Sequence, residues 1–263
     1  MEHIFSKPKK SLGQNFILSS ETVRKIVDLS GDLGNFNVIE IGPGHGALTR
    51  EILKRNPKCL LAVEKDSNLI KQHSQLLSNR YKIIEADALD IVEEKLVELP
   101  VKVIANLPYN ISVPLLIKWL NNIKFFTSLT LMFQKEVAER IVAQPNSKNY
   151  GYLSIITQLL CDVKVEFHLS PQEFFPKPKV YSSVVTIKPL PTERFLVDRA
   201  ALAKLAHTVF SQRRKMLRTS LKSVVNNVEI VLKNAQLSGN ERPENLTIEQ
   251  FCLLANSFVS LAL

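Results

Sequence analysis

A glycine-rich turn is the feature of this sequence that first suggests chemistry. Three of the 8 glycines, Gly42, Gly44 and Gly46, lie close together directly after the apolar run 38–41. Glycines in such a turn permit positive φ and let a ligand approach the backbone closely. A tight strand-to-helix turn with no ligand would have the same sequence, so the motif needs support from other residues.

Two carboxylates give that support, because each ends or follows a later apolar run. Glu64 ends the run 59–64, where a carboxylate can accept hydrogen bonds from both ribose hydroxyls of a nucleoside. Asp87 follows the run 81–84 and could accept a hydrogen bond from an adenine amino group. Ligands of open α/β sheets bind at the carboxyl ends of the parallel strands. The turn and the two acids therefore predict an adenosine-binding site.

A bound adenosine is compatible with two cofactors, a nicotinamide dinucleotide and S-adenosylmethionine. The segment 42–47 formally satisfies the dinucleotide glycine pattern, so the turn alone leaves both open, including a dehydrogenase. Glu40, just before the turn, is more typical of methyltransferases, in which an acid there faces the methionine amino group. That argument is an analogy between families.

The segment 106–109 follows a fourth apolar run and would open onto the same edge of the sheet. A packed turn is the structural alternative, and methylation of an exocyclic amine is the chemical one. The side-chain oxygen of Asn106 and the carbonyl of Leu107 could accept the two N–H bonds of such an amine. Pro108 would stiffen the turn, and Tyr109 could stack on the base. Catalysis would then be positioning and electrostatics, with no metal expected.

The elements that must position these residues follow from hydrophobic periodicity. Near-continuous apolar runs separated by helix-length segments predict parallel strands covered by helices. These runs are 38–41, 59–64, 81–84, 101–104 and 129–133. Two alternating runs, 163–169 and 181–187, predict an antiparallel hairpin at one edge. The fold class is therefore α/β. Beyond a proline-flanked linker near 189–191, helical patterns at 200–225 and 247–261 predict a small all-α domain. We thus expect one domain at 1–190 and a second at 191–263.

Composition limits the classes of protein that the sequence can belong to. The chain has 263 residues, a formal charge of +9 and 45% hydrophobic residues, which is typical of a globular protein. No apolar run approaches the roughly 18 residues of a membrane helix, and the first ten residues lack the apolar stretch of a secretory signal. Its 3 distant cysteines suit a reducing compartment. We expect a cytoplasmic protein that contacts no membrane.

A basic segment in the predicted helical domain is a candidate for binding RNA. Residues 201–228 contain six basic residues and no acid. Arg214, Arg218 and Lys222 are spaced by four, so on one helix they would form a stripe able to follow a phosphate backbone. A solvated helix face explains the same pattern, and the spacing does not decide between the two.

Beyond these patterns, the chain resembles the ribosomal RNA adenine dimethyltransferases along nearly its whole length. The resemblance begins with Asn106-Leu107-Pro108-Tyr109-Asn110-Ile111-Ser112. It extends to the ordered segments 10–17, 134–138, 145–151, 174–182, 210–215 and 244–246. Pro114 and the segment 145–151 are similar to the housekeeping branch, which modifies the small ribosomal subunit, rather than to the antibiotic-resistance branch.

The resemblance implies a seven-stranded, Rossmann-like methyltransferase domain with S-adenosylmethionine as methyl donor. It implies dimethylation of two adjacent adenosines near the 3′ end of 16S ribosomal RNA, with an immature 30S particle as partner, by a monomer. It places Phe174 against the target adenine, opposite Tyr109. Implied cofactor residues are Asn15, Ile17, Gly42, Gly44, Glu64, Asp87 and Asn106. The residues expected to bind RNA are Arg213, Arg214, Lys215, Arg218 and Lys222. A non-enzymatic role in small-subunit assembly is a second function that can coexist with catalysis.

Overall fold

The computed structural model describes residues 8–9 and 12–260. The chain divides into two compact units. One contains Met1–Ala138 and Lys164–Pro189, and the other contains Glu139–Val163 and Leu190–Leu263.

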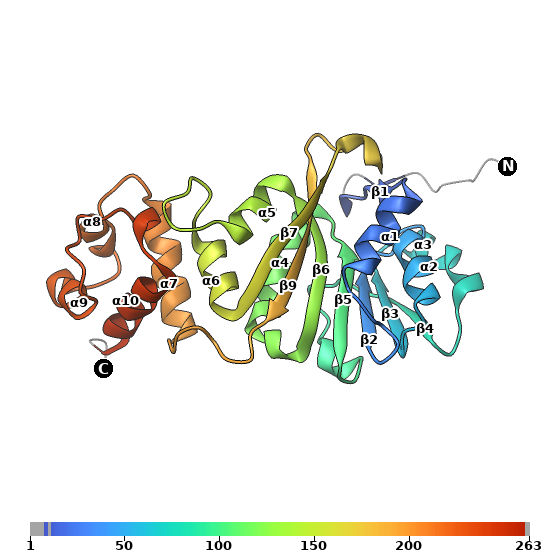
Figure 1. The fold of residues 1–263 in the computed structure, drawn as a ribbon, viewed down its shortest axis with the longest axis horizontal. Helices are drawn as coiled ribbons and strands as arrows, with labels where there is room; N and C mark the ends of the chain where they lie inside the picture. The colour runs from blue at the N-terminus through green and yellow to red at the C-terminus, as the bar shows by residue number, and fades with distance from the viewer. Residues whose placement is uncertain (1–7, 10–11, 261–263) are drawn as a thin grey trace. The chain divides into compact units, whose positions relative to one another are not determined.

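The strands and helices follow one another along the chain, and Figure 1 labels all of them except β8. The strands are β1 (Phe16–Ile17), β2 (Asn37–Ile41), β3 (Cys59–Glu64), β4 (Tyr81–Glu85), β5 (Val101–Asn106), β6 (Phe126–Gln134), β7 (Cys161–Leu169), β8 (Phe174–Phe175) and β9 (Ser182–Pro189). The helices are α1 (Ser20–Asp28), α2 (Ala47–Lys54), α3 (Ser67–Gln72), α4 (Tyr109–Asn121), α5 (Lys135–Val142), α6 (Tyr152–Leu160), α7 (Arg199–Ser211), α8 (Leu217–Leu221), α9 (Val228–Asn234) and α10 (Ile248–Ser260).

Seven strands form one sheet in the order β4-β3-β2-β5-β6-β9-β7. Strands β4, β3, β2, β5 and β6 are parallel, and β9 is antiparallel to β6. The chain runs outward from β2 to β3 and β4, then crosses back to β5 on the other side of β2. The crevice at such a reversal of strand order, outside the carboxyl ends, is where open α/β sheets bind ligands. The glycine turn and the Asn106 segment follow the two strands that meet there.

Burial explains why the parallel strands lack alternation in the sequence. All five residues of β2 are buried, and so are the last five of β3. A strand covered by helices on both faces has no polar face. The predicted edge pair also exists as neighbouring strands, since β9 and β7 occupy the last two places of the sheet. A separate two-stranded pair, β1 with β8, joins the N-terminal segment to the loop before β9.

The second unit differs from the domain predicted from the sequence. The predicted boundary assigns residues 139–163 to the first domain, but in the structure they belong to the helical unit. The physical reason is the burial of α6, which packs against α7 and α10. Seven of its nine residues are buried. The apolar side chains of α6 are therefore buried against helices of the second unit.

Candidate functional site

A cavity of about 850 Å³ lies at the carboxyl ends of β2, β3, β4 and β5. Its lining includes Gly42, Glu64, Asp87 and Asn106, one from the end of each of these strands or the turn after it. This volume is in the range of pockets that enclose a cofactor-sized ligand. The structure therefore brings the predicted adenosine site and the predicted amine site into one space.

The glycine turn between β2 and α2 requires glycine for two reasons. Gly42, Gly44 and Gly46 have φ of 66°, 58° and 81°, the left-handed region that side chains rarely adopt. A Cβ on Gly44 would also lie 2.7 Å from Cε1 of Phe16. The turn is joined to β3, because the Gly42 N–H donates to the Val63 carbonyl at 2.9 Å. Backbone N–H groups are thereby held at the wall of the cavity.

A buried histidine supports this turn from behind. Nε2 of His73 lies 2.9 Å from the carbonyl oxygen of Gly44, and Nδ1 lies 2.6 Å from the hydroxyl of Tyr81. A carbonyl only accepts hydrogen bonds, so Nε2 carries the proton, and the Tyr81 hydroxyl donates to Nδ1. Burial lowers the pKa of His73, which keeps the ring neutral.

Glu40 lies beneath the turn as a buried, incompletely bonded carboxyl group. Its side chain is 1% exposed, and Oε2 accepts a hydrogen bond from the Thr49 hydroxyl at 2.7 Å. Oε1 has no hydrogen-bond partner among the described residues. Burial, with a smaller contribution from the nearby charge of Glu64, raises the pKa of Glu40 to about 8. A buried carboxyl with an unpaired oxygen beside a cavity is suited to receive a cationic ligand group.

Glu64 ends β3 with its carboxylate at the cavity. Oε1 accepts the backbone N–H groups of Lys65 and Asp66, both at 2.9 Å, and Oε2 lies 3.4 Å from the Gly44 nitrogen. The Glu64 side chain is only 7% exposed, and this burial raises the pKa of its carboxyl group despite the hydrogen bonds. These bonds fix the carboxylate beside the glycine turn, as a pair of ribose hydroxyls would require.

Asp87 reaches the cavity with both oxygens already engaged within the chain. Oδ2 accepts from Nζ of Lys65 at 2.6 Å, and Oδ1 accepts from the Leu89 backbone at 2.9 Å. The lysine hydrogen bond is the main reason that the pKa of Asp87 is lowered. Each carboxylate oxygen has two lone pairs, so Asp87 can still accept from a ligand amine. Lys65 thus orients the carboxylate that is predicted to accept the adenine amino group.

The Asn106 segment has the geometry of an acceptor site for an amine. Nδ2 of Asn106 donates to the backbone carbonyl of Asn15 at 2.8 Å, which leaves Oδ1 as the atom able to accept. Leu107 is buried, and Pro108 lies against Gly42, since a Cβ on that glycine would be 3.7 Å from Cδ of Pro108. Tyr109 begins α4, and its hydroxyl is 2.6 Å from Oγ of Ser182. All four residues from Asn106 to Tyr109 line the cavity.

A family model and several known proteins match the chain. The model of the ribosomal RNA adenine dimethylases matches residues 5–260. The chain belongs to the ribosomal RNA adenine dimethylase family. It is 68% identical to ribosomal RNA small subunit methyltransferase A of Wolbachia pipientis from Culex pipiens, covering 98% of this chain and 99% of that protein. It is 52% identical to the protein of the same name from Ehrlichia ruminantium, covering 95% and 96%.

Solved structures agree with this assignment. A dimethyladenosine transferase from Plasmodium falciparum aligns with a TM-score of 0.78 and 27% identity, covering 91% of this chain and 95% of that one. The 23S rRNA methyltransferase ErmE shares the fold, with a TM-score of 0.69 and 22% identity over 93% of this chain and 99% of that one. The seven-stranded, Rossmann-like methyltransferase fold predicted from the sequence is confirmed, and the chain is an adenine dimethyltransferase by family.

Phe174 is not at the position that the resemblance assigns to it. Its side chain is 3% exposed, whereas Phe175 is 50% exposed and lines the cavity. Phe174 pairs with Ile17 between β8 and β1, and successive strand residues face opposite sides. The pairing therefore turns Phe174 into the core and Phe175 toward the cavity. In this structure Phe174 is therefore not exposed to a base in the cavity, and Phe175 is the phenylalanine of this pair that lines the cavity. Ile17 is buried and lines the cavity.

The predicted basic stripe is also wrong, because the helix that would carry it is interrupted. Helix α7 ends at Ser211, and α8 is only Leu217–Leu221. Arg213 donates to the Lys148 carbonyl at 2.9 Å and pairs with Glu244. Arg218 pairs with Glu229 and donates to the Ser238 carbonyl at 2.7 Å. These two arginines therefore hold the helical unit together. Three exposed basic side chains with no ion pair among the described residues remain as RNA-binding candidates: Arg214, Lys215 and Lys222.

Several site residues were missed from the sequence, each for a recognisable reason. Phe175 directly follows Phe174, and the sequence does not show which of these two phenylalanines faces the cavity. His73 lacked any motif. Asp66 does have a signal, because an aspartate directly before a helical segment is a typical N-cap; its carboxylate accepts the Asn68 N–H at 3.1 Å at the start of α3.

In the part of the chain that the structure describes, no helix is both long and apolar enough to cross a membrane.

Proposed function

We propose that this chain dimethylates the N6 amines of two adjacent adenosines near the 3′ end of small-subunit ribosomal RNA, with S-adenosylmethionine as donor. The observation that carries the proposal is the amide of Asn106, whose nitrogen is bonded to Asn15 and whose oxygen is left as an acceptor in the cavity. The names of the Wolbachia and Ehrlichia relatives support the small subunit as substrate.

The cavity fits S-adenosylmethionine in three respects. The unpaired Oε1 of Glu40 would receive the ammonium of the methionine part. Glu64, fixed beside the glycine turn, would accept the ribose hydroxyls, and Asp87 the adenine amine. Asn15 and Ile17 line the same space. When bound, the cofactor supplies an electrophilic methyl group on a sulfonium, which is already a good leaving group.

The residues of the chain would activate the acceptor by placement. An adenine N6 amine is a poor nucleophile, because its lone pair is delocalised into the ring. Oδ1 of Asn106 and the Leu107 carbonyl accept its N–H bonds and favour a tetrahedral nitrogen with the lone pair directed at the donor. Tyr109, with its hydroxyl held by Ser182, and Phe175 offer flat faces for a base that has left its stack.

We place this activity on a partly assembled 30S particle, with the enzyme acting as a monomer in the cytoplasm where ribosomes are assembled. The first unit would perform the methyl transfer, and Arg214, Lys215 and Lys222 of the helical unit would contact RNA phosphates. An assembly role is the second candidate and is compatible with the first. A protein that lacks methyl transfer but still binds particles would show that the two are separable.

Mass spectrometry of nucleosides tests the proposal directly. Undermethylated 30S particles, purified chain and S-adenosylmethionine should yield N6,N6-dimethyladenosine at two neighbouring positions of 16S RNA. Asn106→Ala should reduce this product at least 100-fold in rate, because the lost acceptor acts mainly in the transition state. Asn79→Ala, an exposed asparagine, is the matched control and should retain the wild-type rate. A product confined to DNA, to protein or to monomethyladenosine would contradict the proposal.

A further inference from the structure

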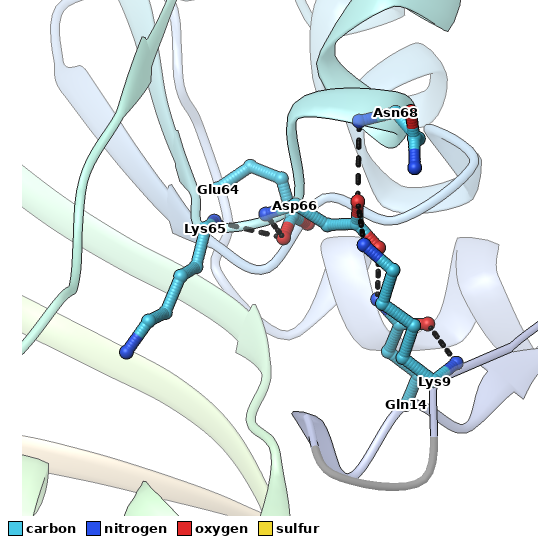
Figure 2. Close-up of polar contacts among 6 residues, drawn as sticks. All are labelled: Lys9, Gln14, Glu64, Lys65, Asp66 and Asn68. Atoms are coloured by element: carbon cyan, nitrogen blue, oxygen red, sulfur yellow. Dashed lines mark hydrogen bonds and ion pairs between the residues drawn. The ribbon is translucent and has the colours of Figure 1, made fainter.

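Asp66 is a buried carboxylate that accepts hydrogen bonds from three groups of the chain, and Figure 2 shows these contacts. Its side chain is 4% exposed. Oδ1 accepts from Nζ of Lys9 at 2.8 Å and from the Asn68 backbone at 3.1 Å, and Oδ2 accepts from Nε2 of Gln14 at 3.1 Å. Its own backbone N–H donates to Glu64 at 2.9 Å. An N-cap needs only the contact with Asn68, so the contacts with Lys9 and Gln14 require another explanation.

The orientation of Gln14 is fixed at both ends of its amide. Oε1 accepts the backbone N–H of Lys9 at 2.8 Å, so Nε2 must be the end that faces Asp66. Gln14 directly precedes Asn15, whose side-chain amide donates to the Gly13 carbonyl at 3.1 Å. The backbone here is thus held in one conformation between a bond to Asp66 and a local turn.

The next link is the residue on which methyl transfer depends. The Asn15 carbonyl accepts from Nδ2 of Asn106 at 2.8 Å. This contact decides which end of the Asn106 amide enters the cavity as an acceptor. With the Asn15 carbonyl displaced, the amide could rotate and present its NH₂ group, which cannot accept an N–H bond from a substrate amine.

We propose that Asp66 is a positioning residue for methyl transfer, acting through Gln14 and the Asn15 carbonyl to orient the amide of Asn106. This inference rests on the proposed function. In this proposal the N-terminal segment does more than line the cavity. Its contacts connect the end of β3, which carries Glu64, to Asn106 on the acceptor side of the site. Asp66 would then contribute to both sides of the site: its backbone N–H binds Glu64, and its side chain orients the Asn106 amide through Gln14.

Charge and burial favour this role for Asp66. Burial alone would raise the pKa of its carboxyl, but hydrogen bonds from Lys9 and Gln14 hold it below the ordinary value. The carboxylate therefore stays ionised and keeps its acceptors across the neutral range. The Lys9 ion pair is half-exposed at the lysine end, so the link through Gln14 is the better candidate for fixing the segment.

A reversal of the hydrogen-bond polarity tests the proposal, and the double variant that restores the bond has the net charge of the wild type. Asp66→Asn keeps an acceptor for the Asn68 N–H but replaces Oδ2 with a donor facing a donor on Gln14. Asp66→Asn combined with Gln14→Glu restores the bond in the opposite direction, because the new carboxylate accepts from the new amide. Asp28→Asn, at an ion-paired carboxylate of α1 remote from the cavity, is the matched control.

Wild-type dimethylation of 16S RNA is measured first, so that a failure of the proposed function is recognised before any variant is interpreted. Single-turnover methyl transfer is then measured with saturating particle and cofactor. We expect Asp66→Asn to slow this step at least fivefold, the Asp66→Asn, Gln14→Glu pair to recover to within twofold of wild type, and Asp28→Asn to be unchanged. A wild-type rate for Asp66→Asn, or a loss that the paired variant does not recover, would overturn the proposal.

Melting temperature and cofactor affinity distinguish positioning from loss of structure. A purely structural role would lower the melting temperature and all kinetic constants together, whereas positioning lowers the single-turnover rate more than it changes the KM for particles. Should Asp66→Asn fail to fold, Gln14→Leu removes the same link and leaves the cap of α3 intact. We expect the same fivefold loss there, and a wild-type rate in Gln14→Leu would equally overturn the inference.

Discussion

The carboxyl of Glu40 should make the stability of the cofactor-free enzyme depend on pH in a way that one substitution removes. Burial raises its pKa from 4.5 to about 8, so between these values the folded protein holds a proton that the unfolded chain has released. Stability is therefore full below pH 4.5 and decreases as pH rises toward 8. Glu40→Gln keeps the shape and an acceptor for Thr49, and its NH₂ replaces the protonated oxygen.

The magnitude follows from the width of this window. Each pH unit well between the two pKa values costs about 1.4 kcal/mol, and less near either pKa, where the carboxyl titrates only in part. The stability of Glu40→Gln relative to wild type should therefore increase by about 3.5 kcal/mol between pH 5 and pH 8. Urea unfolding of both proteins at several pH values measures the difference, in which other titrating groups cancel. Parallel stability profiles for the two proteins would refute the argument.

Cofactor binding should lower the pKa of Glu40, the opposite of what burial does in the cofactor-free protein. The ammonium of S-adenosylmethionine favours the ionised form of Glu40, so binding near pH 7 should release close to one proton from this carboxyl. Titration calorimetry in two buffers of different ionisation enthalpy measures that release. Glu40→Gln should bind S-adenosylmethionine at least tenfold more weakly and show no such proton. Equal affinity in both proteins would contradict the assignment of Oε1 to the ammonium.

Other substitutions have outcomes that separate binding from folding. Asp87→Ala should weaken S-adenosylmethionine binding by about 1 kcal/mol, roughly fivefold in Kd, measured by calorimetry; tight binding of NAD in its place would contradict the adenosine site as assigned. Phe174→Ala should lower the free energy of unfolding by about 3–5 kcal/mol in urea denaturation, whereas Phe175→Ala should leave stability nearly unchanged and weaken binding of the target RNA by about 1–3 kcal/mol. The reverse pattern would restore Phe174 as the stacking residue. Arg214→Ala with Lys215→Ala should reduce RNA affinity and flatten its dependence on salt, measured in filter-binding assays, without altering cofactor affinity; an unchanged salt slope would show that these side chains contact no phosphate.

The parallel strands and the acids at their ends could be predicted because local sequence determines them. Continuous apolar runs mark strands buried on both faces, and β2, β3 and β5 are buried in this way, whereas the edge strand β4 is mostly half-buried or exposed. Glu64 and Asn106 end two of these strands, so their convergence follows from the carboxyl-end rule for ligand sites. The glycine turn is likewise encoded locally, since three positive φ angles demand residues without a Cβ.

The remaining features depend on pairing between distant segments, which periodicity does not reveal. Strands β1 and β8 have two residues each, too few for a pattern, yet their register decides which of two adjacent phenylalanines faces the cavity. The interruption between α7 and α8 contains neither glycine nor proline, so the stripe built on a continuous helix had no warning signal. Helix α6 has an apolar face that packs onto other helices as well as it could pack onto a sheet.

Dimethylation places a demand on this site that a single methyl transfer would not. After the first transfer the amine keeps one N–H and carries a methyl group where the other was, so only one of the two acceptors can still be used. The Leu107 carbonyl is backbone and cannot turn away, whereas the side-chain amide of Asn106 can rotate when its bond to the Asn15 carbonyl is lost. The second transfer should therefore depend more on that bond than the first. A loosened N-terminal segment would then increase the fraction of monomethyladenosine before it abolished methylation.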